Sequence, residues 1–168
     1  MKDNIYLIGF MGTGKSTISK VLKKKMHCQE IDVDAYIVKK QNMEITDIFA
    51  TYGEEYFRQI ETEAFREISL RKDRAVISCG GGAVLREKNV EYMKESGKIV
   101  CLTATPETIY ARVKNSKDRP VLNGHMNVEY IAQLMEKRLS AYEKASDIQV
   151  ATDHKTPEAV AVEIMKKV

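Results

Sequence analysis

The chain has 168 residues, enough to bury a sizeable core and few enough for one unit, so we expect a single domain over residues 1–168. Charged residues make up 30% of the chain, yet the formal net charge is only +3, which provides neither a strongly basic surface nor an acidic tail. We therefore expect no nucleic-acid partner, and we expect the lysine clusters at 23–25, 39–40 and 166–167 to be solvated at helix ends.

The cysteines predict the compartment. Cys28, Cys79 and Cys101 are odd in number and lack CxxC spacing, and two of them fall in apolar runs, as buried thiols in a reducing compartment do. No apolar run approaches the roughly 18 residues of a membrane span, and the first residues lack the apolar core of a signal peptide. We expect a cytoplasmic protein without membrane contact and, because no long apolar helix face is left over, a monomer.

Apolar runs rich in β-branched residues alternate with longer helical patterns along the chain. The runs are nearly continuous in hydrophobicity, as expected for parallel strands covered by helices on both faces. The pattern predicts an α/β fold, a three-layer doubly wound sheet of five parallel strands, at residues 5–8, 31–33, 75–79, 99–102 and 147–151. Helices are predicted directly after the first strand and over residues 53–70, 104–113 and 128–145.

A glycine-rich octapeptide follows the first strand. Residues 9–16 read GFMGTGKS, which fits the pattern of a loop that holds nucleotide phosphates. Lys15 would reach the β- and γ-phosphates and Ser16 would bind Mg²⁺. A turn that only joins a strand to a helix is the alternative. The strand–turn–helix setting favours a site for ATP with Mg²⁺, formed by Gly12, Thr13, Gly14, Lys15, Ser16 and Thr17.

Two carboxylates, Asp32 and Asp34, end the second predicted strand. At a spacing of i, i+2 in a strand, both would point to the same side, at the sheet edge where doubly wound folds bind ligands. The alternative is that one of them only caps the following helix, because aspartate is favoured at that position.

Further along the chain, charged residues and glycines recur at the predicted site. Arg58 and Glu61 lie at i, i+3 on one helix, where a surface ion pair is the alternative to a functional role. Three glycines at residues 80–82 follow the third strand and indicate close approach of a ligand to the backbone. Residues 115–127 are polar and predict a mobile lid over approximately 114–126, while Arg138 on the next helix suits a phosphate or carboxylate.

Together these motifs resemble the shikimate kinase family over nearly the whole chain, from Ile5 to about Lys155. The family markers occur in order: GFMGTGKST at 9–17, DxD at 32–34, IF…GExxFRxxE at 48–61, GGG at 80–82, RP(L/V)L at 119–122 and RxxxY at 138–142. The resemblance implies transfer of the γ-phosphate of ATP to the 3-hydroxyl of shikimate, a step of aromatic amino-acid biosynthesis.

The resemblance also implies roles for single residues. Substrate binding would involve a helical region at approximately 34–61. Arg58 and Arg138 would bind the carboxylate of shikimate, Glu61 would orient Arg58, Asp34 would bind hydroxyls, and Gly80, Gly81 and Gly82 would offer backbone contacts. Lys15, Asp34 and the lid residue Arg119 would be catalytic, with Asp34 expected to position the substrate and the best-placed candidate base. On the nucleotide side, Ser16 would bind Mg²⁺ directly, Asp32 and Ser78 would hold its waters, Arg119 would close on the phosphates, and Arg112 and Lys155 would contact adenine.

Two other functions remain open at this point. One is a kinase for another small hydroxy acid, such as gluconate, on the same scaffold, which fold analogy alone does not exclude. The other is a non-catalytic nucleotide-binding module. The joint occurrence of Arg58, the glycines at 80–82 and Arg138 favours shikimate, and retention of Lys15, Asp34 and Arg119 favours an enzyme.

Overall fold

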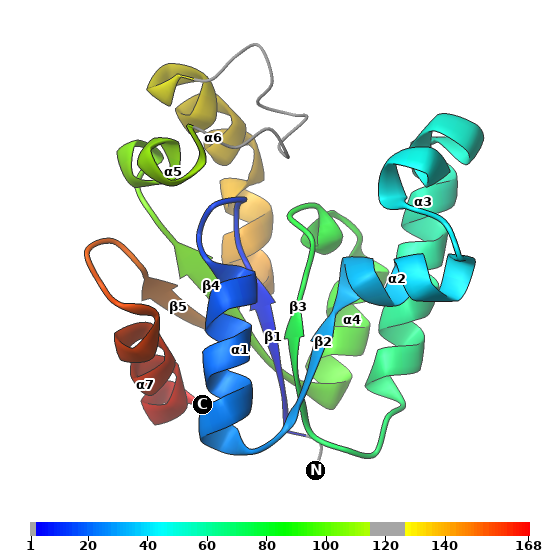
Figure 1. Ribbon diagram of the computed structural model, residues 1–168, viewed down its shortest axis with the longest axis horizontal. Coiled ribbons are helices and arrows are strands. Elements are labelled where there is room, and N and C mark those ends of the chain that lie inside the picture. Colours follow the sequence, from blue (N-terminus) through cyan, green and yellow to red (C-terminus); the bar gives the residue numbers. More distant parts are fainter. Residues whose placement is uncertain (1–2, 115–126) are drawn as a thin grey trace.

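The computed structural model describes residues 3–114 and 127–168. Five parallel strands form one sheet in the order β2-β3-β1-β4-β5, with helices on both faces (Figure 1). The predicted doubly wound α/β fold is therefore confirmed. The predicted lid, with Arg119, lies outside the described residues apart from Lys114. The assignment of the whole chain to a single domain stays a prediction.

The strands and helices alternate along the chain, as the sequence pattern indicates. The strands are β1 (Asn4–Ile8), β2 (Gln29–Asp32), β3 (Ala75–Ser78), β4 (Gly97–Thr103) and β5 (Ile148–Ala151). The helices are α1 (Lys15–Met26), α2 (Val33–Gln41), α3 (Ile45–Ser69), α4 (Glu87–Ser96), α5 (Pro106–Val113), α6 (Val128–Ala145) and α7 (Pro157–Lys167), with a short 3-10 turn η1 (Ala83–Leu85).

The central strand β1 is buried on both faces and divides the core into two layers. Ile5 and Leu7 pack with residues of α1 and α7, whereas Tyr6 and Ile8 pack with residues of α3, α4 and α6. Successive side chains of a strand point to opposite faces, so an uninterrupted apolar strand of this kind requires a helical layer on each side. These layers hold the carboxyl ends of the strands in a fixed relation.

Two helices show how far local sequence signals predict where a helix starts. α5 begins at Pro106, within the predicted range of 104–113, because the Thr105 hydroxyl accepts a hydrogen bond from the Thr108 backbone N–H at 3.2 Å. α3 begins at Ile45, well before the predicted start at Gly53. Gly53 has φ 86° and ψ 173°, which interrupts the helical dihedral angles and hides the first part of the helix from a periodicity argument.

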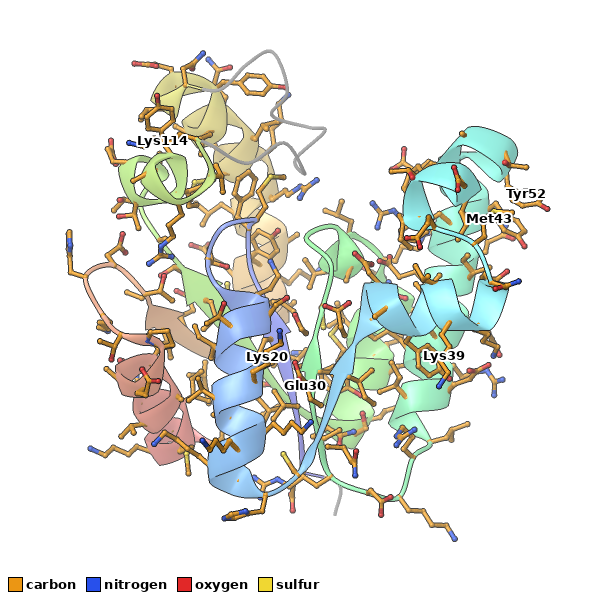
Figure 2. The ribbon with its side chains drawn as sticks, viewed as in Figure 1. Lys20, Glu30, Lys39, Met43, Tyr52 and Lys114 are labelled. Carbon is orange, nitrogen blue, oxygen red and sulfur yellow. The ribbon has the colours of Figure 1, made fainter. Side chains whose placement is uncertain are left out.

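The outer surface carries most of the charged side chains. Lys20 on α1 and Lys39 on α2 are exposed, and Tyr52 lies at the outer end of α3, away from the sheet (Figure 2). The lysine clusters at 23–25, 39–40 and 166–167 are exposed at the last turns of α1, α2 and α7. Within residues 3–114 and 127–168, no helix combines the length and the apolar character that a membrane span requires.

Candidate active site

A cavity of about 500 Å³ lies at the carboxyl ends of β1, β2 and β3, where the segments that follow these strands meet. This is the edge at which doubly wound folds bind ligands. Most of the predicted site residues that the structure describes line it, namely Gly12, Gly14, Lys15, Ser16, Thr17, Asp32, Asp34, Gly80, Gly81, Gly82, Arg112 and Arg138.

The turn over residues 9–14 joins β1 to α1 and forms one wall of this cavity. Gly14 precedes the helix with φ 95°, a left-handed conformation that glycine adopts without a steric penalty. No side chain caps the first turn of α1, so the turn and the helix present backbone N–H groups and the positive end of the helix dipole. The Thr13 side chain is buried and donates to the Phe10 carbonyl at 2.8 Å, so it faces the protein. This wall can hold a polyanion.

Lys15 and Ser16 begin α1 at the same wall. The Lys15 ammonium donates to the carbonyl oxygens of Gly9 at 2.6 Å and Phe10 at 3.2 Å, which holds its charge beside the loop. Ser16 is exposed, and Asp32 lines the cavity from the end of β2. A hydroxyl and a carboxylate are hard oxygen donors of the type that Mg²⁺ prefers, so this donor set fits that ion.

The carboxylates of Asp32 and Asp34 reach the cavity by a route that differs from the prediction. β2 ends at Asp32, whose Oδ1 accepts a hydrogen bond from the Ala35 N–H at 3.0 Å and caps α2. Asp34 therefore lies in the first helical turn, and the prediction that one strand carries both carboxylates on one side is wrong. The capping interaction ends the strand early, because it stabilises a helix that starts at Val33. Both residues still line the cavity.

Asp34 lies in an environment that disfavours its charge. Burial by the surrounding protein raises the pKa of Asp34, and the negative charge of Asp32 raises it further, while Lys15 and Arg58 act in the opposite direction. A carboxylate with a raised pKa accepts a proton more readily than an ordinary aspartate.

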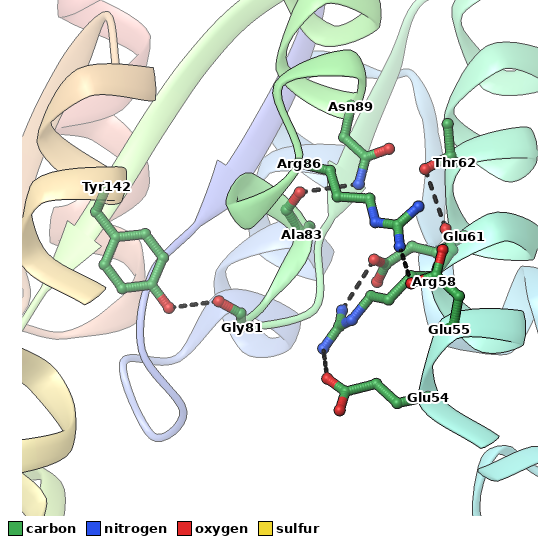
Figure 3. Close-up of polar contacts among 10 residues, drawn as sticks. All are labelled: Glu54, Glu55, Arg58, Glu61, Thr62, Gly81, Ala83, Arg86, Asn89 and Tyr142. Carbon is green, nitrogen blue, oxygen red and sulfur yellow. Dashed lines mark hydrogen bonds and ion pairs between the residues drawn. The ribbon is translucent and has the colours of Figure 1, made fainter. Parts of the chain in front are cut away.

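Arg58 is held on α3 by a buried carboxylate. Its Nη1 donates to Glu61 Oε1 at 2.9 Å, and Glu54 Oε1 lies 3.7 Å from its Nη2 (Figure 3). Glu61 is only 1% exposed, so the alternative of a solvated surface pair does not describe this contact. Burial raises the pKa of Glu61, and the positive charge of Arg58 opposes that rise.

The glycine turn at residues 80–82 lies between two guanidinium groups. A Cβ atom at Gly82 would stand 2.6 Å from Nη2 of Arg58, and one at Gly81 would stand 2.9 Å from Nη1 of Arg138. The absence of side chains here lets both arginines approach the same short backbone segment. Two guanidinium groups that converge in this way can bind one carboxylate.

Arg112 and Lys155, the predicted adenine contacts, differ in their placement. Arg112 on α5 donates to the Gly12 carbonyl at 3.0 Å, and to the Thr152 hydroxyl at 3.0 Å and carbonyl at 3.1 Å. It therefore joins the turn over residues 9–14, which we call the phosphate-loop turn, to the segment after β5. Lys155 is not among the residues that line the cavity, and its ammonium pairs with Glu163 at 2.9 Å.

Tyr142 is a contact at this site to which the sequence analysis gave no role. Its hydroxyl donates to the Gly81 carbonyl at 2.6 Å, from one helical turn beyond Arg138. The i, i+4 spacing of the two residues puts them on one face of α6 and was the available signal. Met11 and Val113 also line the cavity, and their apolar side chains gave no distinct signal in the sequence.

Comparison with known proteins gives one consistent result. The family model described as shikimate kinase matches residues 11–168. A shikimate kinase from Thermodesulfovibrio yellowstonii is 44% identical over 98% of this chain and 94% of its own length. The solved shikimate kinase from Acinetobacter baumannii, in complex with shikimate, has a TM-score of 0.89 at 29% identity and covers 99% of this chain and 93% of its own.

The scaffold is shared more widely. A solved gluconokinase from Sinorhizobium meliloti has a TM-score of 0.62 at 14% identity and covers 98% of this chain and 90% of its own. At that level of identity the likeness concerns the fold alone.

Proposed function

Because the chain belongs to the shikimate kinase family, we propose that it transfers the γ-phosphoryl group of ATP to the 3-hydroxyl of shikimate, giving shikimate 3-phosphate and ADP. The observation that carries this assignment is the convergence of Arg58 and Arg138 on the glycine turn at 80–82, a turn that lines the same cavity as the phosphate-loop turn. Shikimate carries a carboxylate and three hydroxyl groups, so a site for it requires cations and a hydrogen-bond acceptor.

On the nucleotide side, residues 12–17 hold the phosphates of ATP through backbone N–H groups and the helix N-terminus. Lys15 adds a positive charge where negative charge develops on the transferred group. Ser16 would hold Mg²⁺, and Asp32, with one oxygen occupied by the Ala35 N–H, would hold it through water together with Ser78. When bound, Mg²⁺ would supply positive charge that offsets the phosphate charge.

On the acceptor side, Arg58 and Arg138 bind the carboxylate of shikimate, and Glu61 keeps the Arg58 guanidinium oriented. Backbone groups of the glycine turn complete that end of the site. Asp34 accepts a hydrogen bond from the reacting hydroxyl and orients its oxygen toward the phosphorus. Phosphoryl transfer through a loose transition state depends more on such positioning than on early removal of the proton, so we assign Asp34 to positioning first and to proton acceptance second.

The remaining predicted contacts form the outer nucleotide site. Arg119 lies outside the described residues, and its role as a cation that closes on the phosphates rests on the resemblance of residues 119–122. Arg112 is proposed to border the adenine site. Its hydrogen bonds to Gly12 and Thr152 hold the guanidinium group between the phosphate-loop turn and the segment after β5. Lys155 is proposed as a weaker adenine contact that must first leave Glu163. We further propose a cytoplasmic monomer, consistent with the free thiols of the described cysteines.

An acceptor panel tests the assignment against a gluconate-type kinase. Phosphorylation by ATP and Mg²⁺ is measured with shikimate, gluconate and other small hydroxy acids at equal concentrations. We expect kcat/KM for shikimate to exceed that for gluconate by about a hundredfold or more, because a site with placed hydrogen-bond groups rejects ligands that leave them unpaired. Equal values for the two acids would refute the assignment. ATP binding without turnover of any acceptor would instead indicate a binding module.

A further inference from the structure

The glycine turn is held almost entirely through its backbone. The Ala83 N–H donates to Gly80 and the Leu85 N–H to Gly82, both at 3.1 Å, which are local contacts. The Gly81 carbonyl is bound from much further along the chain, by the Tyr142 hydroxyl at 2.6 Å (Figure 3). A turn without side chains cannot be fixed by packing of its own, so such backbone contacts decide its conformation.

The surrounding core holds the Tyr142 side chain in place. It is 6% exposed, within the core between the sheet and α6. Arg138 lies one turn earlier on the same helix, with its guanidinium against Gly81. One rigid helix therefore supplies both the cation and the hydroxyl that sets the distance between that cation and the glycine turn.

The Tyr142 hydroxyl also determines the direction in which the neighbouring backbone N–H, that of Gly82, points. The carbonyl of Gly81 and the N–H of Gly82 belong to one peptide unit, and no cis peptide bond occurs among the described residues. In a planar trans unit these two groups point in opposite directions. A carbonyl held toward Tyr142 therefore turns the Gly82 N–H away from α6. Figure 3 shows Gly81 between Tyr142 on one side and the α3 residues with Arg58 on the other.

We propose that Tyr142 is a positioning residue for the acceptor substrate: its hydroxyl fixes the peptide between Gly81 and Gly82, and so the spacing of Arg138 and Arg58 around the substrate carboxylate. Tyr142 is not among the residues that line the cavity, and it acts through this peptide and through Arg138, with which its hydroxyl also interacts. The inference rests on the proposed assignment of Arg58, Arg138 and the glycine turn to shikimate binding.

The test replaces the hydroxyl alone, with Tyr142→Phe. Loss of one well-formed hydrogen bond from a preorganised site should raise the KM for shikimate about fivefold, with the KM for ATP changed by less than about twofold and kcat by less than about threefold. Tyr6→Phe is the matched control. Tyr6 is fully buried in the same core, its hydroxyl bonds Ser96 at 2.7 Å, and neither of these two residues lines the cavity.

Thermal unfolding of both variants is measured first, since each loses one buried hydroxyl. We expect similar losses of stability but a raised KM for shikimate only in Tyr142→Phe. If that variant is too unstable, all three proteins are compared in trimethylamine N-oxide, which favours compact states. A shikimate KM within about twofold of the parent, or an equal change in Tyr6→Phe, would overturn the proposal.

The variant Arg138→Ala distinguishes a failure of this inference from a failure of the proposed substrate site. If Arg138→Ala leaves the KM for shikimate unchanged, the assignment of the substrate site is wrong and the role of Tyr142 with it. If Arg138→Ala raises that KM while Tyr142→Phe does not, the site assignment stands and only the positioning role fails.

Discussion

Replacing Arg58 with alanine tests both the architecture and the function of the site. The variant leaves the Glu61 carboxylate, 1% exposed, without the guanidinium that lies 2.9 Å away. Breaking a buried ion pair costs about 3–5 kcal/mol. The Arg58 side chain, however, is 17% exposed, so water screens part of the charge of this pair. We therefore expect a loss of about 2–3 kcal/mol, near the value of a charge-assisted hydrogen bond. For a chain of this size that lowers Tm by about 4–12 °C.

The loss should depend on pH in a defined direction. Burial already raises the pKa of Glu61, and removal of Arg58 eliminates the principal opposing charge, so this pKa rises further in the variant. A group whose pKa is raised in the folded state destabilises the protein increasingly as pH rises through that pKa. The Tm difference between variant and parent should thus be larger at about pH 8 than at about pH 5. Adding Glu61→Gln should reduce this pH dependence.

Thermal unfolding and steady-state kinetics provide the measurements. Arg66→Ala is the control, because Arg66 and Glu63 form an exposed ion pair on the same helix at the same spacing. We expect its Tm to fall by less than about 2 °C. In Arg58→Ala, the KM for shikimate should rise by about a hundredfold while the KM for ATP stays nearly level. Equal Tm losses in the two variants would refute the buried-pair argument, and equal rises in both KM values would place Arg58 outside the substrate site.

Three further variants probe the other walls of the cavity. Lys15→Ala should lower kcat by about a hundredfold or more, because positive charge is lost where phosphate charge develops; near-full kcat would contradict that role. Asp34→Asn should lower kcat and remove the fall in activity that we expect for the parent as pH drops through the raised pKa of Asp34, and an unchanged acidic limb would show that another group controls it. Gly82→Ala retains an allowed φ of −96° but puts a Cβ 2.6 Å from Arg58 Nη2, so the KM for shikimate should rise about tenfold; an unchanged KM would mean that Arg58 can move aside without effect.

Structural features that depend on residues close together in the sequence could be predicted. The phosphate-loop turn lies within a few residues of β1 and α1, and its residues converge on one wall as expected. The helix predicted over residues 104–113 is likewise present as α5, which starts at Pro106 after a threonine cap, a local signal. The roles of these residues toward ATP stay a prediction.

Two kinds of feature could not be predicted: those in which one residue suits two different local structures, and those that depend on contacts between residues far apart in the chain. Asp32 suits both a strand end and a helix cap, and the sequence does not decide between them, so the position of Asp34 in a helical turn was missed. The bond from Tyr142 to Gly81 joins residues that are 61 positions apart, and only the packing of α6 against the glycine turn brings them together. Similarly, nothing in an i, i+3 pair distinguishes the buried Glu61 from the exposed Glu63.

The carboxylate of shikimate provides the most direct test of the account. Steady-state kcat/KM is measured for shikimate and for its carboxamide, with the parent protein and with Arg58→Ala. We predict that the parent favours the carboxylate by about a hundredfold, as paired charged hydrogen bonds require, and that Arg58→Ala loses most of this preference. If both proteins show the same preference, or neither distinguishes the two acceptors, the guanidinium groups around the glycine turn do not recognise the substrate, and the proposed site is wrong.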